Sequence, residues 1–149
     1  MFRISIKIPI GLRLVTIRGF AYVEYNRCMT DIEFDELITR AMNELPQKYI
    51  KGLRNVAIVM ADDPTLEQQH KMKLGQQQLL LGLYEGIPLT QRGSNYTFVL
   101  PDKITLFKNS LMAVSADENQ LFEQIKRTLW HEIAHYYGLN HARINKIQK

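Results

Sequence analysis

Two histidines near the C-terminus have the spacing of metal ligands on a helix. His131 and His135 are four residues apart, and such residues lie one turn apart on the same face of an α-helix. Both imidazoles can therefore reach one ion, and zinc accepts neutral imidazole nitrogen at about 2.0–2.1 Å. Glu132 follows the first histidine, where its carboxylate can take a proton from a metal-activated water molecule. The pattern predicts one zinc ion per chain, with Glu132 as general base.

A third histidine extends this motif. Gly138 lets the chain reverse after the helix, and His141 follows three residues later, as in the longer zincin motif with a third histidine ligand. A chain of this composition would contain the longer motif by chance in roughly one case in 100,000. We therefore predict metal ligation by His131, His135 and His141. The alternative is that no metal binds, and that His131 and His135 are one core and one surface histidine beside a solvated Glu132. The apolar neighbours of these residues instead favour a partly buried site.

The net charge of the 149-residue chain is +4, and all of it comes from the first 28 residues. Residues 29–149 contain equal numbers of basic and acidic residues, so they offer no charge argument for nucleic-acid binding. Cys28 is the only cysteine, which leaves no pair for a disulfide within the chain. No apolar run approaches the roughly 18 residues of a membrane span. We expect a cytoplasmic protein with no nucleic-acid or membrane partner.

The first part of the chain contains one clear helix and a strand pattern. Residues 2–8 alternate apolar and polar side chains, which is typical of a strand, whereas residues 12–25 have no clean period. Thr30 and Glu33 have the spacing of a capping box. Apolar residues then recur at helical intervals, and we predict a helix over residues 31–45.

Farther along the chain, apolar runs predict three strands and a final helix. The predicted strands are residues 54–60, which we expect to be buried, residues 79–83 and residues 103–111. Residues 62–78 are polar and rich in glutamine, and they are predicted to form a long loop with a solvated His70. The final helix should begin with a capping box of Ser115 and Glu118 and end near Gly138, because glycine adopts the left-handed conformation that ends helices.

From Met29 onward, the sequence resembles the small bacterial zincin-like metallopeptidases, also called minimal zincins. The matching segments are Met29-Thr30-Asp31, residues 82–90, residues 100–106 and Thr128-Leu129-Trp130-His131-Glu132. The resemblance implies a compact α+β fold, with a small sheet packed on two main helices and the metal-binding motif on the C-terminal helix. It also implies zinc at His131 and His135 and a catalytic Glu132. The third ligand stays open between His141, water and an upstream carboxylate.

The resemblance and the charge distribution suggest a division of the chain at Met29. Residues 1–28 are predicted to be a basic N-terminal extension, and residues 29–149 a zincin-like metallopeptidase domain. The competing interpretation is that residues 3–8 pair as an edge strand of that domain, because their alternation suits a half-buried position.

The motif and the resemblance together predict a zinc-dependent metallopeptidase that acts on a peptide or protein. The strand over residues 104–108 is a candidate edge for an extended substrate, and Arg92 or a tyrosine is a candidate donor to the transition state. One alternative is a metal-dependent endoribonuclease with a three-histidine site, which Glu132 and the neutral charge of residues 29–149 disfavour. The other is a zinc-binding module without turnover.

Overall fold

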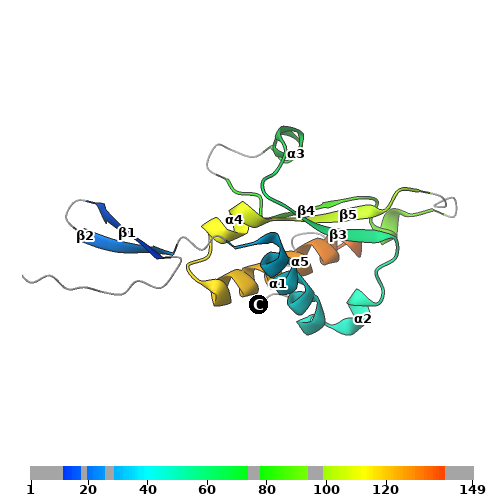
Figure 1. The fold of residues 1–149 in the computed structure, drawn as a ribbon. Coiled ribbons are helices and arrows are strands. Elements are labelled where there is room, and N and C mark those ends of the chain that lie inside the picture. Colours follow the sequence, from blue (N-terminus) through cyan, green and yellow to red (C-terminus); the bar gives the residue numbers. More distant parts are fainter. Residues whose placement is uncertain (1–11, 18–19, 26–28, 74–77, 94–98, 140–149) are drawn as a thin grey trace, which may run out of the picture.

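The described part of the chain is an α+β arrangement of helices and short strands. The computed structural model describes residues 12–17, 20–25, 29–73, 78–93 and 99–139. In chain order the elements are β1 (Leu12–Ile17), β2 (Phe20–Tyr25), α1 (Asp31–Glu44), α2 (Gln47–Ile50), β3 (Val56–Ala61), α3 (Leu66–Lys71), β4 (Gly82–Glu85), the 3-10 turn η1 (Leu89–Gln91), β5 (Asp102–Phe107), α4 (Lys108–Ala113) and α5 (Glu118–Tyr136). The predicted class is confirmed, since α1 and α5 pack on a small mixed sheet (Figure 1).

The sheet that carries the core has the strand order β3-β5-β4. β5 pairs with β3 in parallel and with β4 in antiparallel register, with Ile104 opposite both Ile58 and Tyr84. Five of its six residues are buried, as expected for a central strand. The prediction that residues 104–108 form an exposed edge for substrate is therefore wrong, because β5 has a partner strand on each side. Among the described residues, the edges of this sheet are β3 and β4.

Helix α1 begins at the predicted capping box. The Thr30 hydroxyl accepts from the Glu33 N–H at 3.2 Å, and the Glu33 carboxylate accepts from the Thr30 N–H at 2.8 Å. These two bonds satisfy amides that have no partner within the first helical turn. The helix ends at Glu44, one residue before the predicted boundary.

Helix α5 begins differently from the prediction. Its N-cap is Asp117, whose carboxylate accepts from the Gln120 N–H at 2.8 Å. The hydroxyl of Ser115 donates instead to the Leu111 carbonyl at 2.7 Å. The prediction of a capping box formed by Ser115 and Glu118 is wrong, because the preceding helix α4 already engages the serine.

The strand predicted over residues 103–111 is only partly confirmed. Strand β5 stops at Phe107, and helix α4 occupies Lys108–Ala113. Both elements bury apolar side chains, although the residues at their junction, Lys108-Asn109-Ser110, are polar. The short apolar segments on either side do not by themselves distinguish a buried strand from a buried helical turn.

Helices α1 and α5 cover one face of the sheet (Figure 1), and one apolar cluster joins the two helices to the sheet. Its fully buried members include Phe34 and Ala41 of α1, Ile104 and Leu106 of β5, and Ile125, Leu129 and Ile133 of α5. Burial of each larger side chain stabilises the fold by about 1.5–3 kcal/mol. The cluster therefore holds the C-terminal half of α5, which carries the histidine motif, firmly against the sheet.

The opposite face of the sheet is covered only in part. Figure 1 shows α3 on this side, and Leu80, Leu83 and Phe107 form a second small cluster. The prediction of a loop over residues 62–78 missed α3, which opens with a capping box between Thr65 and Gln68. The predicted burial of the strand over residues 54–60 is wrong, because β3 is an edge strand and its residues alternate between partly buried and exposed.

The N-terminal part that the structure describes is a β-hairpin. The backbones of β1 and β2 pair in antiparallel register and form a two-stranded sheet of their own. The strand predicted over residues 2–8 lies outside the described residues, and the division of the chain at Met29 stays a prediction. In the ranges that the structure describes, no helix has the length and apolar character needed to cross a membrane.

Candidate metal centre

The two predicted ligands on α5 face one another. Nε2 of His131 and Nε2 of His135 are 3.1 Å apart, and the two rings are nearly perpendicular, at 79°. Tetrahedral zinc with nitrogen ligands at 2.0–2.1 Å requires ligand atoms about 3.3–3.4 Å apart. The imidazole pair is within a few tenths of an ångström of that separation, so these residues fit a zinc ion without a change of helix geometry.

The chain reverses its direction after α5, as the sequence predicts. Gly138 has φ +80°, its N–H donates to the His135 carbonyl, and the Leu139 N–H donates to the Ala134 carbonyl at 3.0 Å. This pair of bonds closes the helix in the manner of a Schellman motif. A Cβ at Gly138 would also collide with Oγ1 of Thr90. Both backbone conformation and space therefore require glycine at this position.

The third ligand is not defined by the described residues. His141 lies outside them, and the described part of the chain contains no cluster of three His, Cys, Asp or Glu side chains that could hold a metal. The structure therefore brings together His131 and His135, and the assignment of His141 stays a prediction.

Glu132 lies on α5, and its carboxylate contacts the edge strand β4. The residue is 7% exposed, and Oε2 accepts a hydrogen bond from the backbone N–H of Tyr84 at 2.9 Å. Burial raises the pKa of Glu132 to about 7, although the Tyr84 hydrogen bond acts in the opposite direction. A carboxyl group with such a pKa can both accept and release a proton near neutral pH. No sequence pattern indicates this role for Tyr84, because its contribution is a backbone amide.

Gly82 lets β4 approach the helix at this point. A Cβ at Gly82 would lie 2.6 Å from Cγ2 of Thr128 and 3.2 Å from Cγ of Glu132. The first distance is shorter than any ordinary carbon contact, so a side chain here would displace the helix or the strand. Gly82 is a second residue of the site that spacing did not identify, although it lies in a segment that resembles the family.

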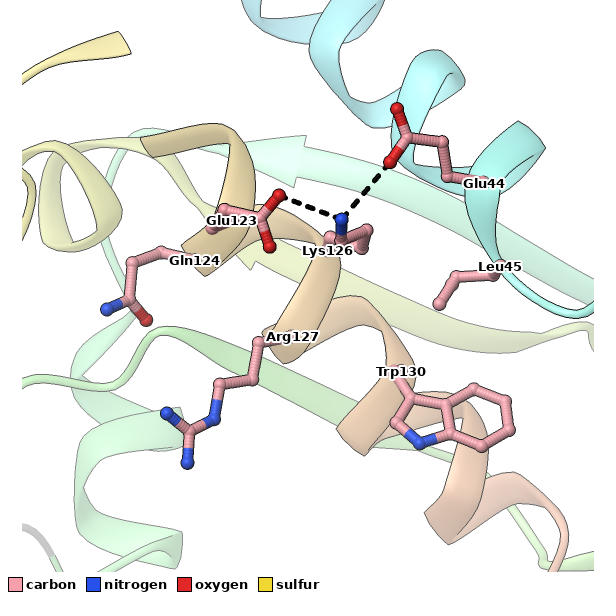
Figure 2. A pocket seen from close by; sticks show the side chains of 7 residues that line it. All are labelled: Glu44, Leu45, Glu123, Gln124, Lys126, Arg127 and Trp130. Atoms are coloured by element: carbon pink, nitrogen blue, oxygen red, sulfur yellow. Dashed lines mark hydrogen bonds and ion pairs between the residues drawn. The ribbon is translucent and has the colours of Figure 1, made fainter. Parts of the chain in front are cut away.

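An open groove of about 450 Å³ lies beside the motif, between β4 and α5. Its lining residues are Leu80, Leu81, Gly82, Gln124, Arg127, Thr128, His131 and Glu132. A second groove, of about 510 Å³, lies between the end of α1 and α5, and it shares Gln124 and Arg127 with the first (Figure 2). The first histidine and the predicted base therefore line a surface large enough for several residues of a peptide.

Arg92 and the described tyrosines of this region have structural contacts instead of positions in the groove. Arg92 forms a buried ion pair with Asp102, and its Nε donates to the Ile87 carbonyl at 2.8 Å. The Tyr84 hydroxyl also donates to Asp102, and burial together with that carboxylate raises the pKa of Tyr84. Tyr136 is fully buried, with its hydroxyl on the backbone of Arg54. None of these side chains lines the groove beside the histidines.

The fold and the site define a class of α+β proteins with a His-Glu-x-x-His motif on a helix packed against a mixed sheet. The sequence model of the zincin-like metallopeptidase family matches residues 53–149. Since this match covers more than half of the chain, the protein belongs to the zincin-like metallopeptidase family. Membership supports a metal-dependent, peptidase-like function.

Two further comparisons assign no activity to the chain. A solved structure of a conserved hypothetical protein from T. thermophilus is similar, with 23% identity and a TM-score of 0.49. The match covers 73% of this chain and 94% of that one. No curated protein matches the chain at a significant level.

Proposed function

We propose that the protein is a zinc-dependent metallopeptidase in which His131 and His135 hold the ion and Glu132 is the general base. The observation that carries the proposal is the 3.1 Å separation of the two Nε2 atoms on the helix turn that also carries a buried carboxylate. Family membership over residues 53–149 supports the same chemistry. His141 is proposed as the third ligand on the basis of its spacing alone.

The protein side chains have separate tasks in the proposed reaction. Bound zinc would supply Lewis-acid activation of a water molecule and of the scissile carbonyl. Oε2 of Glu132 is fixed by the Tyr84 N–H, which leaves Oε1 to accept the proton of the attacking water. Glu132 then delivers this proton to the leaving amine, a transfer for which its carboxylate is placed next to His131 in the sequence and beside the groove.

Strand β4 is the proposed binding edge for the substrate backbone. The Leu81 carbonyl accepts from the Phe107 N–H of β5 at 3.0 Å, so alternate residues of β4 direct their backbone groups toward β5. Gly82 and Tyr84 direct theirs to the other side, where Glu132 lies. The Tyr84 N–H on this edge is taken by Glu132, so an extended peptide would pair with the remaining backbone groups of Gly82 and Tyr84, beside the proposed metal ligands. This edge would replace the one that the sequence predicted at residues 104–108.

The decisive experiment combines metal analysis with cleavage of a peptide library. Zinc-loaded wild-type protein should cleave peptides, whereas Glu132→Gln should retain zinc and lose cleavage. Glu36→Gln, which removes an exposed carboxylate from α1, is the matched control and should behave as wild type. Zinc binding by the wild type without cleavage of any peptide would contradict the peptidase assignment and favour a binding module.

A further inference from the structure

Arg127 occupies a central position on the surface beside the motif. It lines the groove between β4 and α5 and also the groove between α1 and α5. It precedes His131 by four residues, which places its Cα one helical turn, about 6 Å, along the axis from that ligand. The residue is exposed, so its guanidinium is accessible to a molecule in the groove.

The neighbouring Lys126 has carboxylate partners, whereas Arg127 has none among the described residues. Glu123 is four residues before Arg127, a spacing that favours an ion pair on a helix. The Glu123 carboxylate contacts Lys126 instead, at 2.8 Å, and Lys126 also contacts Glu44 at 3.1 Å. Figure 2 shows the Arg127 side chain extended away from these three residues. The helix surface therefore presents one guanidinium whose charge is not neutralised by the described carboxylates around it.

We propose that Arg127 binds a carboxylate of the peptide substrate, so that the enzyme prefers acidic peptides or peptides with a free C-terminal carboxylate close to the cleaved bond. This inference rests on the proposed peptidase function and specifies the substrate class of the same site. An extended peptide advances about 3.3 Å per residue, so the distance of one helical turn corresponds to about two residues. The carboxylate should therefore lie within about two residues of the cleaved bond.

The surroundings of Arg127 favour a carboxylate over other charged groups. The groove residues next to it, Gln124 and Thr128, are polar and uncharged, and the one acidic residue in that lining, Glu132, is buried at the metal site. A guanidinium binds a carboxylate through two parallel hydrogen bonds.

An RNA strand is a poorer match to the same surface. It would require several cations along its backbone. Apart from Arg127, Lys126 is the only lysine or arginine among the described residues that line either groove. Lys126 is already paired with two carboxylates, so the two grooves offer no track of free cations for a row of phosphates.

The test measures binding separately from cleavage. Zinc-loaded Glu132→Gln protein is titrated with N-acetylated, C-terminally amidated peptides that carry Glu, Gln or Lys at one position. A second pair of peptides differs only in a free or amidated C-terminus, and a short single-stranded RNA is included. Binding is measured by isothermal titration calorimetry, because Trp130, the only tryptophan of the chain, lines the other groove (Figure 2). The same peptides are then offered to the wild type for cleavage.

Arg127→Gln and Arg127→Glu are compared with Lys71→Gln in this background. Lys71 is exposed on α3, on the far side of the sheet (Figure 1), so its loss removes the same charge away from both grooves. Glu132→Gln protein should bind one of the carboxylate peptides roughly threefold to tenfold more tightly than its neutral counterpart. Arg127→Gln should lose this preference, Arg127→Glu should favour the Lys peptide, and Lys71→Gln should keep the preference of the Glu132→Gln protein.

Each result of these binding and cleavage measurements either supports or contradicts the inference. A preference for the Glu peptide identifies a side-chain carboxylate, and a preference for the free C-terminus identifies the terminal one. Equal binding of all peptides, a preference that survives in Arg127→Gln, or Arg127-dependent binding of RNA but not of peptide would overturn the inference. An Arg127-dependent carboxylate preference without cleavage by the wild type would instead contradict the proposed peptidase function and leave the binding site established.

Discussion

The backbone N–H of Tyr84 in β4 donates a 2.9 Å hydrogen bond to Oε2 of Glu132 in α5. The two residues are 48 positions apart in the sequence, and the bond links the edge strand to the helix that carries the histidines. A backbone donor has little freedom to move, so it fixes the carboxylate more firmly than a side-chain donor would. Changes to β4 should therefore affect the orientation of the proposed base.

The first prediction separates a base from a ligand at Glu132. In Glu132→Gln, the amide oxygen can still accept the Tyr84 hydrogen bond, but the side chain no longer accepts a proton. Peptide cleavage should fall by about 10²–10⁴-fold, whereas zinc content measured by atomic absorption should equal that of the wild type. Loss of zinc in this variant would place Glu132 in the coordination shell and contradict its assignment as base.

The second prediction concerns the two proposed zinc ligands on α5, His131 and His135. His131→Ala or His135→Ala should each remove zinc from the purified protein, because a single helical imidazole leaves too few protein ligands for tight binding. His70→Ala is the matched control, since His70 lies exposed on α3, on the other side of the sheet (Figure 1). Stoichiometric zinc in both α5 variants would show that the metal site lies elsewhere.

A third prediction tests the ligand that lies outside the described residues. If His141 completes the site, His141→Ala should weaken zinc binding, measured in competition with a chelator of known affinity, and His141→Asp should restore part of it because carboxylate oxygen also binds zinc. Unchanged affinity in His141→Ala would assign the position to water or to an upstream carboxylate.

The sequence predicted the parts of the site that depend on local spacing. A separation of four residues on a helix places His131 and His135 together whatever surrounds them, and a glycine after a helix predicts the reversal at Gly138. The capping box at Thr30 is also local and was found at the predicted place.

Features that depend on contacts between distant segments were missed or wrongly predicted. The position of β5 in the sheet depends on two strands that pair with it from different parts of the chain, and no periodicity within residues 104–108 specifies an edge or a centre. The roles of Tyr84 and Gly82 depend on how closely β4 approaches α5. Arg92 has the right chemistry for a transition-state donor, but its ion pair with Asp102 only becomes visible in three dimensions.

The fourth prediction tests the close approach of β4 to α5 at Gly82. Gly82→Ala places a methyl group 2.6 Å from Cγ2 of Thr128, and overpacking of this kind typically costs about 1–3 kcal/mol of stability. Chemical denaturation should show this loss, and Thr128→Ser in the same chain should recover part of it by removing the methyl group. Gly93→Ala is the control, because an added Cβ there meets no described atom within 4 Å. Equal stability of Gly82→Ala and Gly93→Ala would show that β4 does not need glycine.

The last prediction concerns the division of the chain at Met29. A chain that begins at Met29 keeps this buried residue, which is 4% exposed in the main core cluster, and also keeps the Thr30 cap. If residues 1–28 are an extension, this shortened chain should melt within a few degrees of the full chain and bind zinc equally well, because removal of a solvated segment costs almost nothing. If the segment instead pairs with the domain, the loss of its apolar side chains should cost several kcal/mol, at about 1.5–3 kcal/mol for each one fully buried.

A second shortened chain calibrates this comparison. A chain that begins at Ile32 lacks both Met29 and the Thr30 cap, which should cost about 1 kcal/mol for the cap and about 1.5–3 kcal/mol for the buried methionine. Its melting temperature should therefore fall clearly below that of the chain beginning at Met29, which shows that the measurement detects losses of this size. Failure of the chain beginning at Met29 to fold, or a melting temperature as low as that of the shorter chain, would show that residues 1–28 contribute to the folded domain.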